Sequence, residues 1–130
     1  MPKRDLPRPT DAELEILNVL WRSGPCTVRD VHQAIIRAKP ATGYTTVLKT
    51  MQIMAEKGLV QRDESQRAHV YEARLAREQT QRQLVGHLLE RAFDGSATKL
   101  VMQALSAKKA SAEELTTIRE MLDEFERGES

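Results

Sequence analysis

Apolar residues recur at every third or fourth position over three segments of the first half of the chain, which predicts three amphipathic helices. The first helix follows a capping box made by Thr10 and Glu13, and it stops at residues 23–25. Its apolar stripe consists of Leu14, Leu17, Leu20 and Trp21. The second helix begins near Thr27, which with Asp30 resembles a second N-terminal cap, and it runs to about Lys39, before Pro40. Its stripe consists of Val28, Val31, Ile35 and Ala38. Residues 26–28 form either a very short strand or a turn.

The third segment predicts a helix whose two faces differ strongly in chemistry. It starts at Thr42 or Gly43 and ends at Gly58, since glycine commonly follows the last turn of a helix. The apolar face consists of Tyr44, Val47, Leu48, Met51, Met54 and Ala55. The opposite face consists of Thr42, Thr45, Thr46, Lys49, Thr50 and Gln52. Because it contains no acid, and because hydroxyl, amide and ammonium groups can reach phosphates and base edges, this face predicts a contact surface for DNA.

The threonines of this helix have a second explanation. Threonine is a weak helix former, and a helix buried on all sides tolerates it through packing. We favour the exposed alternative because the surrounding sequence is basic: residues 27–50 contain four lysines or arginines and a single acid, Asp30, in a chain of net charge +1. Ile53 lies near the polar face, and the sequence leaves open whether it meets a thymine methyl group or covers the base of the following hairpin.

Two short strand-like segments, residues 59–63 and 68–72, follow the third helix and flank a four-residue loop. They predict a hairpin with Arg62 and Arg67 near its tip. Helices followed by a hairpin are the order of elements in a winged helix-turn-helix, in which this hairpin is the wing. Arg67 is then a contact to phosphate or the minor groove, or simply a solubilising edge residue.

The second half of the chain has no strand-like segment and predicts three more amphipathic helices. They cover residues 78–93, the region of residues 100–105, and residues 112–125 after a capping box made by Ser111 and Glu114. Helices this short cannot readily bury their stripes alone, so they pack on the first half or on a second copy of the chain. We favour a homodimer, because a palindromic DNA site matches a protein two-fold axis. The residues assigned to its interface are Leu84, Leu88, Leu89, Phe93, Leu100, Val101, Leu105, Leu115, Ile118, Leu122 and Phe125.

Composition excludes several classes of protein. The chain has 130 residues, 40% of them hydrophobic and 30% charged, which is typical of a globular protein with one domain or one small domain and an appendage. A single cysteine, the absence of a signal peptide and the absence of a membrane-length apolar run predict a cytoplasmic protein without membrane insertion.

Candidate chemistry is sparse. The sequence shows neither a catalytic constellation, nor a glycine-rich phosphate loop, nor the spacing of metal ligands, so we expect no enzyme activity, no cofactor and no metal. Cys26 precedes a helix and could be a thiol of low pKa. We favour a small buried residue there, because free cysteine is among the more buried residue types.

Five segments together closely resemble the BlaI/MecI/CopY family of bacterial repressors, the penicillinase repressor family. They are residues 10–21, ending in Trp21, and residues 27–31, 44–48, 56–60 and 70–71. The similarity extends from Leu6 to about Phe125. It implies a mainly α protein with a winged helix-turn-helix domain (residues 10–74) and a small helical dimerisation domain (residues 75–130). It also implies that a homodimer represses transcription by occupying a palindromic operator. Residues 1–9 are rich in proline and charge, and we expect them to form a flexible tail.

The resemblance carries site residues over by position. It implies that Thr45, Thr46 and Lys49 contact DNA, with Tyr44 near the DNA backbone and Arg67 in the wing. Thr42 and Gln52 are further candidates from the helical projection alone. An alternative is a winged helix that binds a protein instead of DNA. The acid-free hydroxyl face of the third helix favours DNA.

The chain departs from the family pattern in two places. The β-lactam-responsive members are inactivated when the signal of a membrane sensor leads to cleavage at an Asn–Phe bond, and Ser96 and Ala97 stand at that position here. We expect the chain to belong to a β-lactam- or stress-responsive system that is relieved by proteolysis. The cleavage site is then either shifted along the chain or read by a different protease. The remaining alternative is that the chain has no such site. The copper-responsive members carry Cys-x-Cys pairs near the C-terminus, and this chain ends without cysteine, so copper sensing through that motif is not expected.

Overall fold

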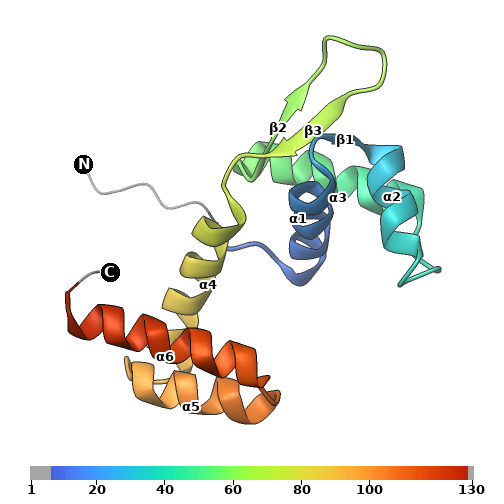
Figure 1. Ribbon diagram of the computed structural model, residues 1–130. Helices are drawn as coiled ribbons and strands as arrows, with labels where there is room; N and C mark the ends of the chain where they lie inside the picture. Colours follow the sequence, from blue (N-terminus) through green and yellow to red (C-terminus); the bar gives the residue numbers. More distant parts are fainter. Residues whose placement is uncertain (1–6, 129–130) are drawn as a thin grey trace, which may run out of the picture. The chain divides into compact units, whose positions relative to one another are not determined.

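The computed structural model describes residues 7–128, which form two compact units (Figure 1). The first unit extends to Val85 and the second begins at Gly86, so the division falls within one helix, α4 (Arg77–Ala92). The mainly α fold class predicted from the sequence is confirmed.

The first unit is a winged helix. Its elements in chain order are α1 (Asp11–Ser23), β1 (Cys26–Thr27), α2 (Val28–Ile36), α3 (Tyr44–Lys57), β2 (Val60–Asp63) and β3 (Val70–Ala73). The strand β3 lies in the middle of a three-stranded antiparallel sheet, in which Tyr71 pairs with Cys26 of β1 and with Arg62 of β2. The β2–β3 hairpin extends away from the three helices (Figure 1). It is the predicted wing.

Local sequence signals set the ends of the helices. Thr10 and Thr27 begin α1 and α2 with reciprocal capping boxes, in which each hydroxyl accepts a backbone N–H and an acid three residues later accepts one in return. At the other end of α3, Gly58 adopts the left-handed conformation (φ 87°), which a side chain would strain. These predicted caps are confirmed.

The core of this unit is built from one face of each helix together with residues of all three strands. On α3, the side chains of Val47, Met51 and Met54 are at most 1% exposed. Tyr71 lies at the same depth and supplies the aromatic part of the core. The remaining buried apolar residues are Ile16, Leu17, Val19, Leu20, Cys26, Val28, Val31, Leu59 and Val60. Burial of this set leaves the opposite face of α3 free.

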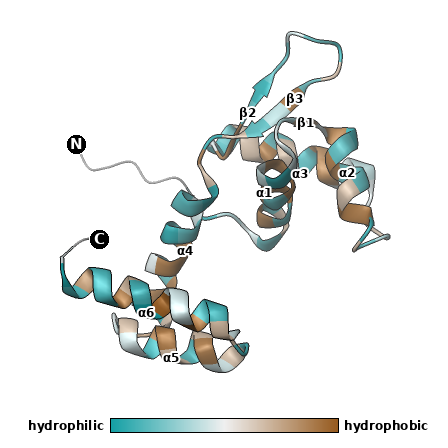
Figure 2. Cartoon of the chain, in the orientation of Figure 1, coloured by the Kyte–Doolittle hydropathy of each residue, from teal (hydrophilic) through white to brown (hydrophobic). Residues whose placement is uncertain are grey.

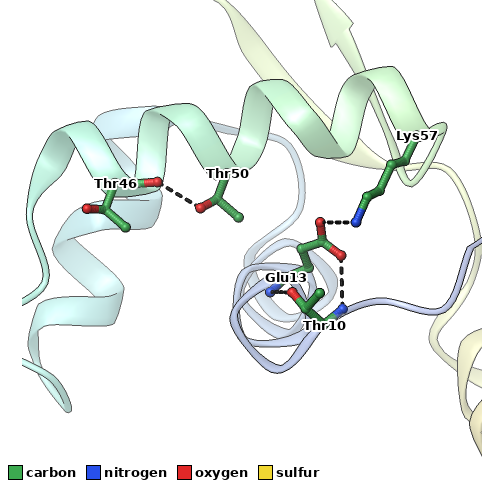
Figure 3. A network of polar contacts seen from close by, with 5 residues as sticks. All are labelled: Thr10, Glu13, Thr46, Thr50 and Lys57. Atoms are coloured by element: carbon green, nitrogen blue, oxygen red, sulfur yellow. Dashed lines mark hydrogen bonds and ion pairs between the residues drawn. The ribbon is translucent and has the colours of Figure 1, made fainter.

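A polar network ties α1 to the last turn of α3 (Figure 3). The Glu13 carboxylate is buried, accepts the Thr10 backbone N–H at 2.9 Å, and accepts a hydrogen bond from Lys57 Nζ at 2.7 Å. A buried carboxylate without such partners would be strongly disfavoured. Glu13 is therefore both a helix cap and a clamp between two helices far apart in sequence.

Two predicted boundaries were wrong. Helix α2 ends at Ile36 rather than near Lys39, because the chain turns at residues 37–38 and the residue before Pro40 is disfavoured in a helix. The wing loop has six residues, 64–69, rather than four, because the ladder ends with Asp63 opposite Val70. The Asp63 carboxylate accepts the Ser65 N–H at 2.9 Å and turns the chain out of the sheet.

Two predicted apolar stripes also need correction. Tyr44, assigned to the apolar face of α3, is 46% exposed, because it is the first helical residue and lies beyond the edge of the core. On α1 the buried stripe includes Ile16 and Val19, whereas Leu14 is only half-buried. The β1 strand settles the alternative left open for residues 26–28.

The second unit contains the end of α4 together with α5 (Ala97–Ala107) and α6 (Ala112–Glu126). The predicted capping box of Ser111 and Glu114 begins α6. Neither α5 nor α6 has a single buried residue among those described. Figure 2 shows hydrophobic residues along both helices. Within residues 7–128, helices are too short or too polar to span a lipid bilayer.

We expect Glu13→Gln to lower the free energy of unfolding by about 1–3 kcal/mol near neutral pH, because it weakens a buried charged hydrogen bond to Lys57. Burial raises the pKa of Glu13, but the hydrogen bonds from Lys57 and Thr10 and the Lys57 charge outweigh burial and hold the pKa below its ordinary value of 4.5. The stabilisation is therefore complete above pH 4.5 and is lost as the pH falls through the lower pKa of the folded state.

Urea unfolding of both proteins across this pH range tests the clamp. The difference in stability should shrink below pH 4.5, as the carboxyl group of the unaltered protein becomes protonated. The matched control is Glu56→Gln, at an exposed position on the same helix as Lys57. An equal loss of stability in both variants, or a loss independent of pH, would contradict the role given to Glu13.

Candidate nucleic-acid interface

The polar face of α3 is open to solvent and presents the predicted contact residues together. Thr45, Thr46, Lys49 and Gln52 are all exposed, since the core takes the other side of the helix. Thr50 differs: it is half-buried, and its hydroxyl donates to the Thr46 carbonyl oxygen at 2.8 Å (Figure 3). Bonding to the preceding turn uses the only proton of that hydroxyl.

The start of α3 is held by α2. His32 Nε2 lies 2.9 Å from the carbonyl oxygen of Thr42, the half-buried residue that precedes the helix cap Gly43. The His32 ring also meets the Tyr44 ring edge to face, with 5.6 Å between the ring centres. Thr42 therefore contributes a backbone contact that positions the helix, and Tyr44 is oriented by the neighbouring helix.

A groove of about 920 Å³ runs between α2, α3 and the wing. Three of the sequence-predicted residues line it, namely Tyr44, Gln52 and Arg67. Its basic side chains come from three separate elements: Arg29 from α2, Arg62 from β2 and Arg67 from the wing loop. Thr45, Thr46 and Lys49 lie on the exposed surface of α3 outside the groove lining. The face and the groove together form what we term the α3–wing surface.

The sequence prediction missed the contribution of α2 to this surface. Arg29, His32, Gln33 and Ile36 line the groove at helical spacing. The same spacing was available in the sequence, because on a helical projection these four residues form one stripe beside the buried stripe of Val28 and Val31. What the projection does not show is that this side of α2 faces α3 and the wing.

The wing holds an ion pair where β2 meets the wing loop. Arg62 Nη2 and Glu64 Oε2 are 2.5 Å apart on the hairpin surface. A hydrogen bond to the Tyr71 hydroxyl and the pairing with Glu64 raise the pKa of Arg62, which is charged at any physiological pH. At the next position, hydrogen bonds from Ser65 lower the pKa of Asp63.

Comparison with known proteins identifies the family. The family model described as penicillinase repressor matches residues 9–124. The chain belongs to the penicillinase repressor family. Transcriptional regulator BlaI of Mycobacterium tuberculosis, in strains CDC 1551 and H37Rv, is 32% identical over 124 residues, which cover 95% of this chain and 88% of that protein. Penicillinase repressor of Bacillus licheniformis is 24% identical over 123 residues, which cover 93% of this chain and 94% of the relative.

A solved structure supports the fold of this penicillinase repressor family member. The solution structure of the DNA binding domain of the repressor BlaI matches it with a TM-score of 0.50 and 20% sequence identity. The match covers 58% of this chain and 90% of the other. At that identity the likeness establishes the winged-helix fold.

In this family member the predicted dimer-interface residues are all at least partly open to solvent. Leu88, Val101, Leu105, Leu122 and Phe125 are exposed, between 38% and 57%. The half-buried members of the set are Leu84, Leu89, Phe93, Leu100, Leu115 and Ile118. Exposed apolar side chains on successive helices are a common sign of a protein interface.

The predicted cleavage region lies between two helices. Ser96 is the N-cap of α5, and its hydroxyl accepts the Lys99 N–H at 3.1 Å. Ala97 is exposed and begins the helix. The connection before them turns through left-handed conformations at Asp94 (φ 51°) and Gly95 (φ 77°). A protease would therefore meet a short turn followed by a capped helix start.

Cys26 of this family member is a packed thiol. It is buried in β1, and its Sγ donates to the Gly24 carbonyl oxygen at 3.2 Å. Burial and the nearby Asp30 charge raise the pKa of Cys26, so the alternative of a low-pKa thiol is wrong. Among residues 7–128 no three histidine, cysteine or acidic side chains gather as a metal site would require.

We expect Cys26 in the folded protein to react with Ellman's reagent at least about tenfold more slowly than in urea, because the thiol is buried and largely protonated. Absorbance of the released thionitrobenzoate measures the rate. A cysteine-containing peptide, measured with and without urea at the same pH, corrects for the effect of urea on the chemistry. Equal corrected rates in the two states would show that the site is open.

Proposed function

We propose that the chain is a homodimeric bacterial transcriptional repressor that binds a palindromic operator through α3 and the wing. The observation that carries the proposal is the α3–wing surface. It combines exposed hydroxyl, amide and ammonium groups on one helix with arginines from three elements around a groove. Such surfaces anchor phosphates with their cations and read base edges with their short polar groups.

Family membership supports the same function. The relatives are named as a transcriptional regulator and as a penicillinase repressor, and the solved neighbour is titled a DNA binding domain. We assign Lys49 and Arg67 to phosphates, Thr45, Thr46 and Gln52 to base edges and register, and Tyr44 and Thr42 to positions near the DNA backbone. A repressor acts by occupying DNA, so it needs neither catalysis nor a cofactor. We assign it to the cytoplasm, because bacterial chromosomal DNA lies there.

The helical half, residues 75–130, is assigned to dimerisation. A helix of 11 residues and a helix of 15 residues with no buried side chain lack the packing that stabilises short helices, and a second copy would provide it. A dimer holds two reading helices at one spacing, which raises the effective concentration of the second half-site. Affinity for the operator therefore depends on this half.

This dependence provides a route for induction. A cut between Glu78 and Ser111 would separate the reading helices from part of the dimer interface, and operator affinity would fall. Ser96 and Ala97, at the start of α5, are the candidate site, and the signal would come from a membrane sensor protease acting indirectly. Incubation with extracts of induced cells should yield two fragments. Loss of repression with an intact chain would argue for another route.

Fluorescence anisotropy with DNA from the promoter region of the protein's own gene tests the proposed function. We expect tight, strongly salt-dependent binding to this DNA and weak binding to a scrambled duplex. Lys49→Ala should weaken binding to both duplexes and lower the slope of log affinity against log salt by about 1. The matched control is Arg22→Ala, which removes one exposed positive charge from α1 outside the α3–wing surface.

The outcomes separate the possibilities. Equal losses of DNA affinity in the two variants would show that Lys49 acts only through the overall charge of the protein. Failure of the unaltered protein to distinguish the duplexes would favour a winged helix that binds a protein partner instead.

We expect Leu122→Lys to convert dimers to monomers, because it places a charge on the apolar face of α6, where Leu122 is 56% exposed in the single chain. Thr117→Lys is the matched control, since it adds the same charge on the opposite side of α6. Sedimentation equilibrium of both variants gives the association state. A Leu122→Lys variant that stays dimeric would move the interface to another surface.

A further inference from the structure

Arg62 lies on the same surface as the proposed DNA contacts but outside the set assigned so far. It is on β2, and it lines the groove together with Arg67, Tyr44 and Gln52. Arg62 therefore borders the space between the wing and α3. Its side chain is 33% exposed, so a bound molecule can reach it.

A core residue, Tyr71, sets the position of Arg62. Tyr71 is directly opposite in the antiparallel ladder and only 1% exposed. The hydrogen bond between the guanidinium group and the Tyr71 hydroxyl holds the arginine against a rigid part of the sheet. Arginine has five N–H donors, so this bond leaves donors for other partners.

Glu64 accepts from some of the remaining N–H donors of Arg62. Its carboxylate pairs with Arg62 at 2.5 Å from the exposed wing loop, where its own side chain is 52% exposed. Ion pairs this open to water contribute little to stability, so the wing does not need this pair in order to fold. An acid beside a surface for a polyanion also opposes binding by charge repulsion.

We propose that Arg62 is a further phosphate-binding residue of the DNA interface and that Glu64 competes with DNA for its guanidinium group. The inference rests on the proposed function. In the free protein Glu64 neutralises Arg62, and on binding a phosphate oxygen replaces the carboxylate. Because phosphates occur in every DNA sequence, this exchange lowers affinity for all DNA. Only a site that also satisfies α3 then holds the protein tightly.

A double-mutant cycle measured by anisotropy at low salt tests the exchange. Arg62→Ala should weaken binding to operator and scrambled DNA alike, roughly threefold to tenfold, and lower the salt slope by about 1. Glu64→Gln should strengthen binding about threefold or more to both duplexes. In the Arg62→Ala background the same change should strengthen binding less than about twofold, because the competition is gone.

Two controls keep the test specific. Glu56→Gln removes an exposed acid from α3 outside the groove lining and should leave affinity within about twofold. Arg62→Lys keeps the charge but loses the planar fork, so it should restore the salt slope and only part of the affinity. Circular dichroism on heating establishes that each variant is folded.

Each outcome decides the proposal. A larger gain from Glu64→Gln with Arg62 present than without it supports the exchange. Equal gains in both backgrounds, or unchanged binding in Arg62→Ala, overturn it while the proposed function stands. No DNA binding by the unaltered protein overturns both.

Discussion

The packing of one face of α3 is the constraint on which the first unit depends. Val47, Met51 and Met54 are almost fully removed from water, and helices α1 and α2 enclose them. Burial of these three side chains supplies a large part of the hydrophobic stabilisation. Since a helix that buries one side must present the other, the same packing exposes Thr45, Thr46, Lys49 and Gln52. Stability and recognition are two consequences of one amphipathic helix.

Polar contacts refine the position that the core sets. Glu13 links the start of α1 to Lys57 at the end of α3, and His32 contacts the backbone before the start of α3. Both ends of the helix are thus held by neighbouring helices. A surface that reads DNA needs this rigidity, because displacement by about 1 Å would break hydrogen bonds whose length varies by less than that. The wing is held differently, through the pairing of Tyr71 with both neighbouring strands.

The two halves of the chain solve the problem of burial in opposite ways. The first half encloses thirteen buried apolar residues in a core of its own. In the second half, α5 and α6 bury none of their residues, although apolar positions repeat along both helices. A small set of helices has too little interior to bury all of its apolar side chains. The two halves therefore differ in how much of their apolar surface the chain itself buries.

The sequence by itself determined the elements and their amphipathic faces, because helix caps, glycine turns and apolar periodicity act over a few residues. It predicted α3 and its polar face, the three capping boxes and the order of a winged helix. Only the tertiary structure decided which separate elements share a surface. The groove formed by Arg29, His32 and Arg62, the contact of Glu13 with Lys57 and the six-residue wing loop depend on contacts between distant segments. Local patterns carry no information on such contacts, since they arise only when the core closes.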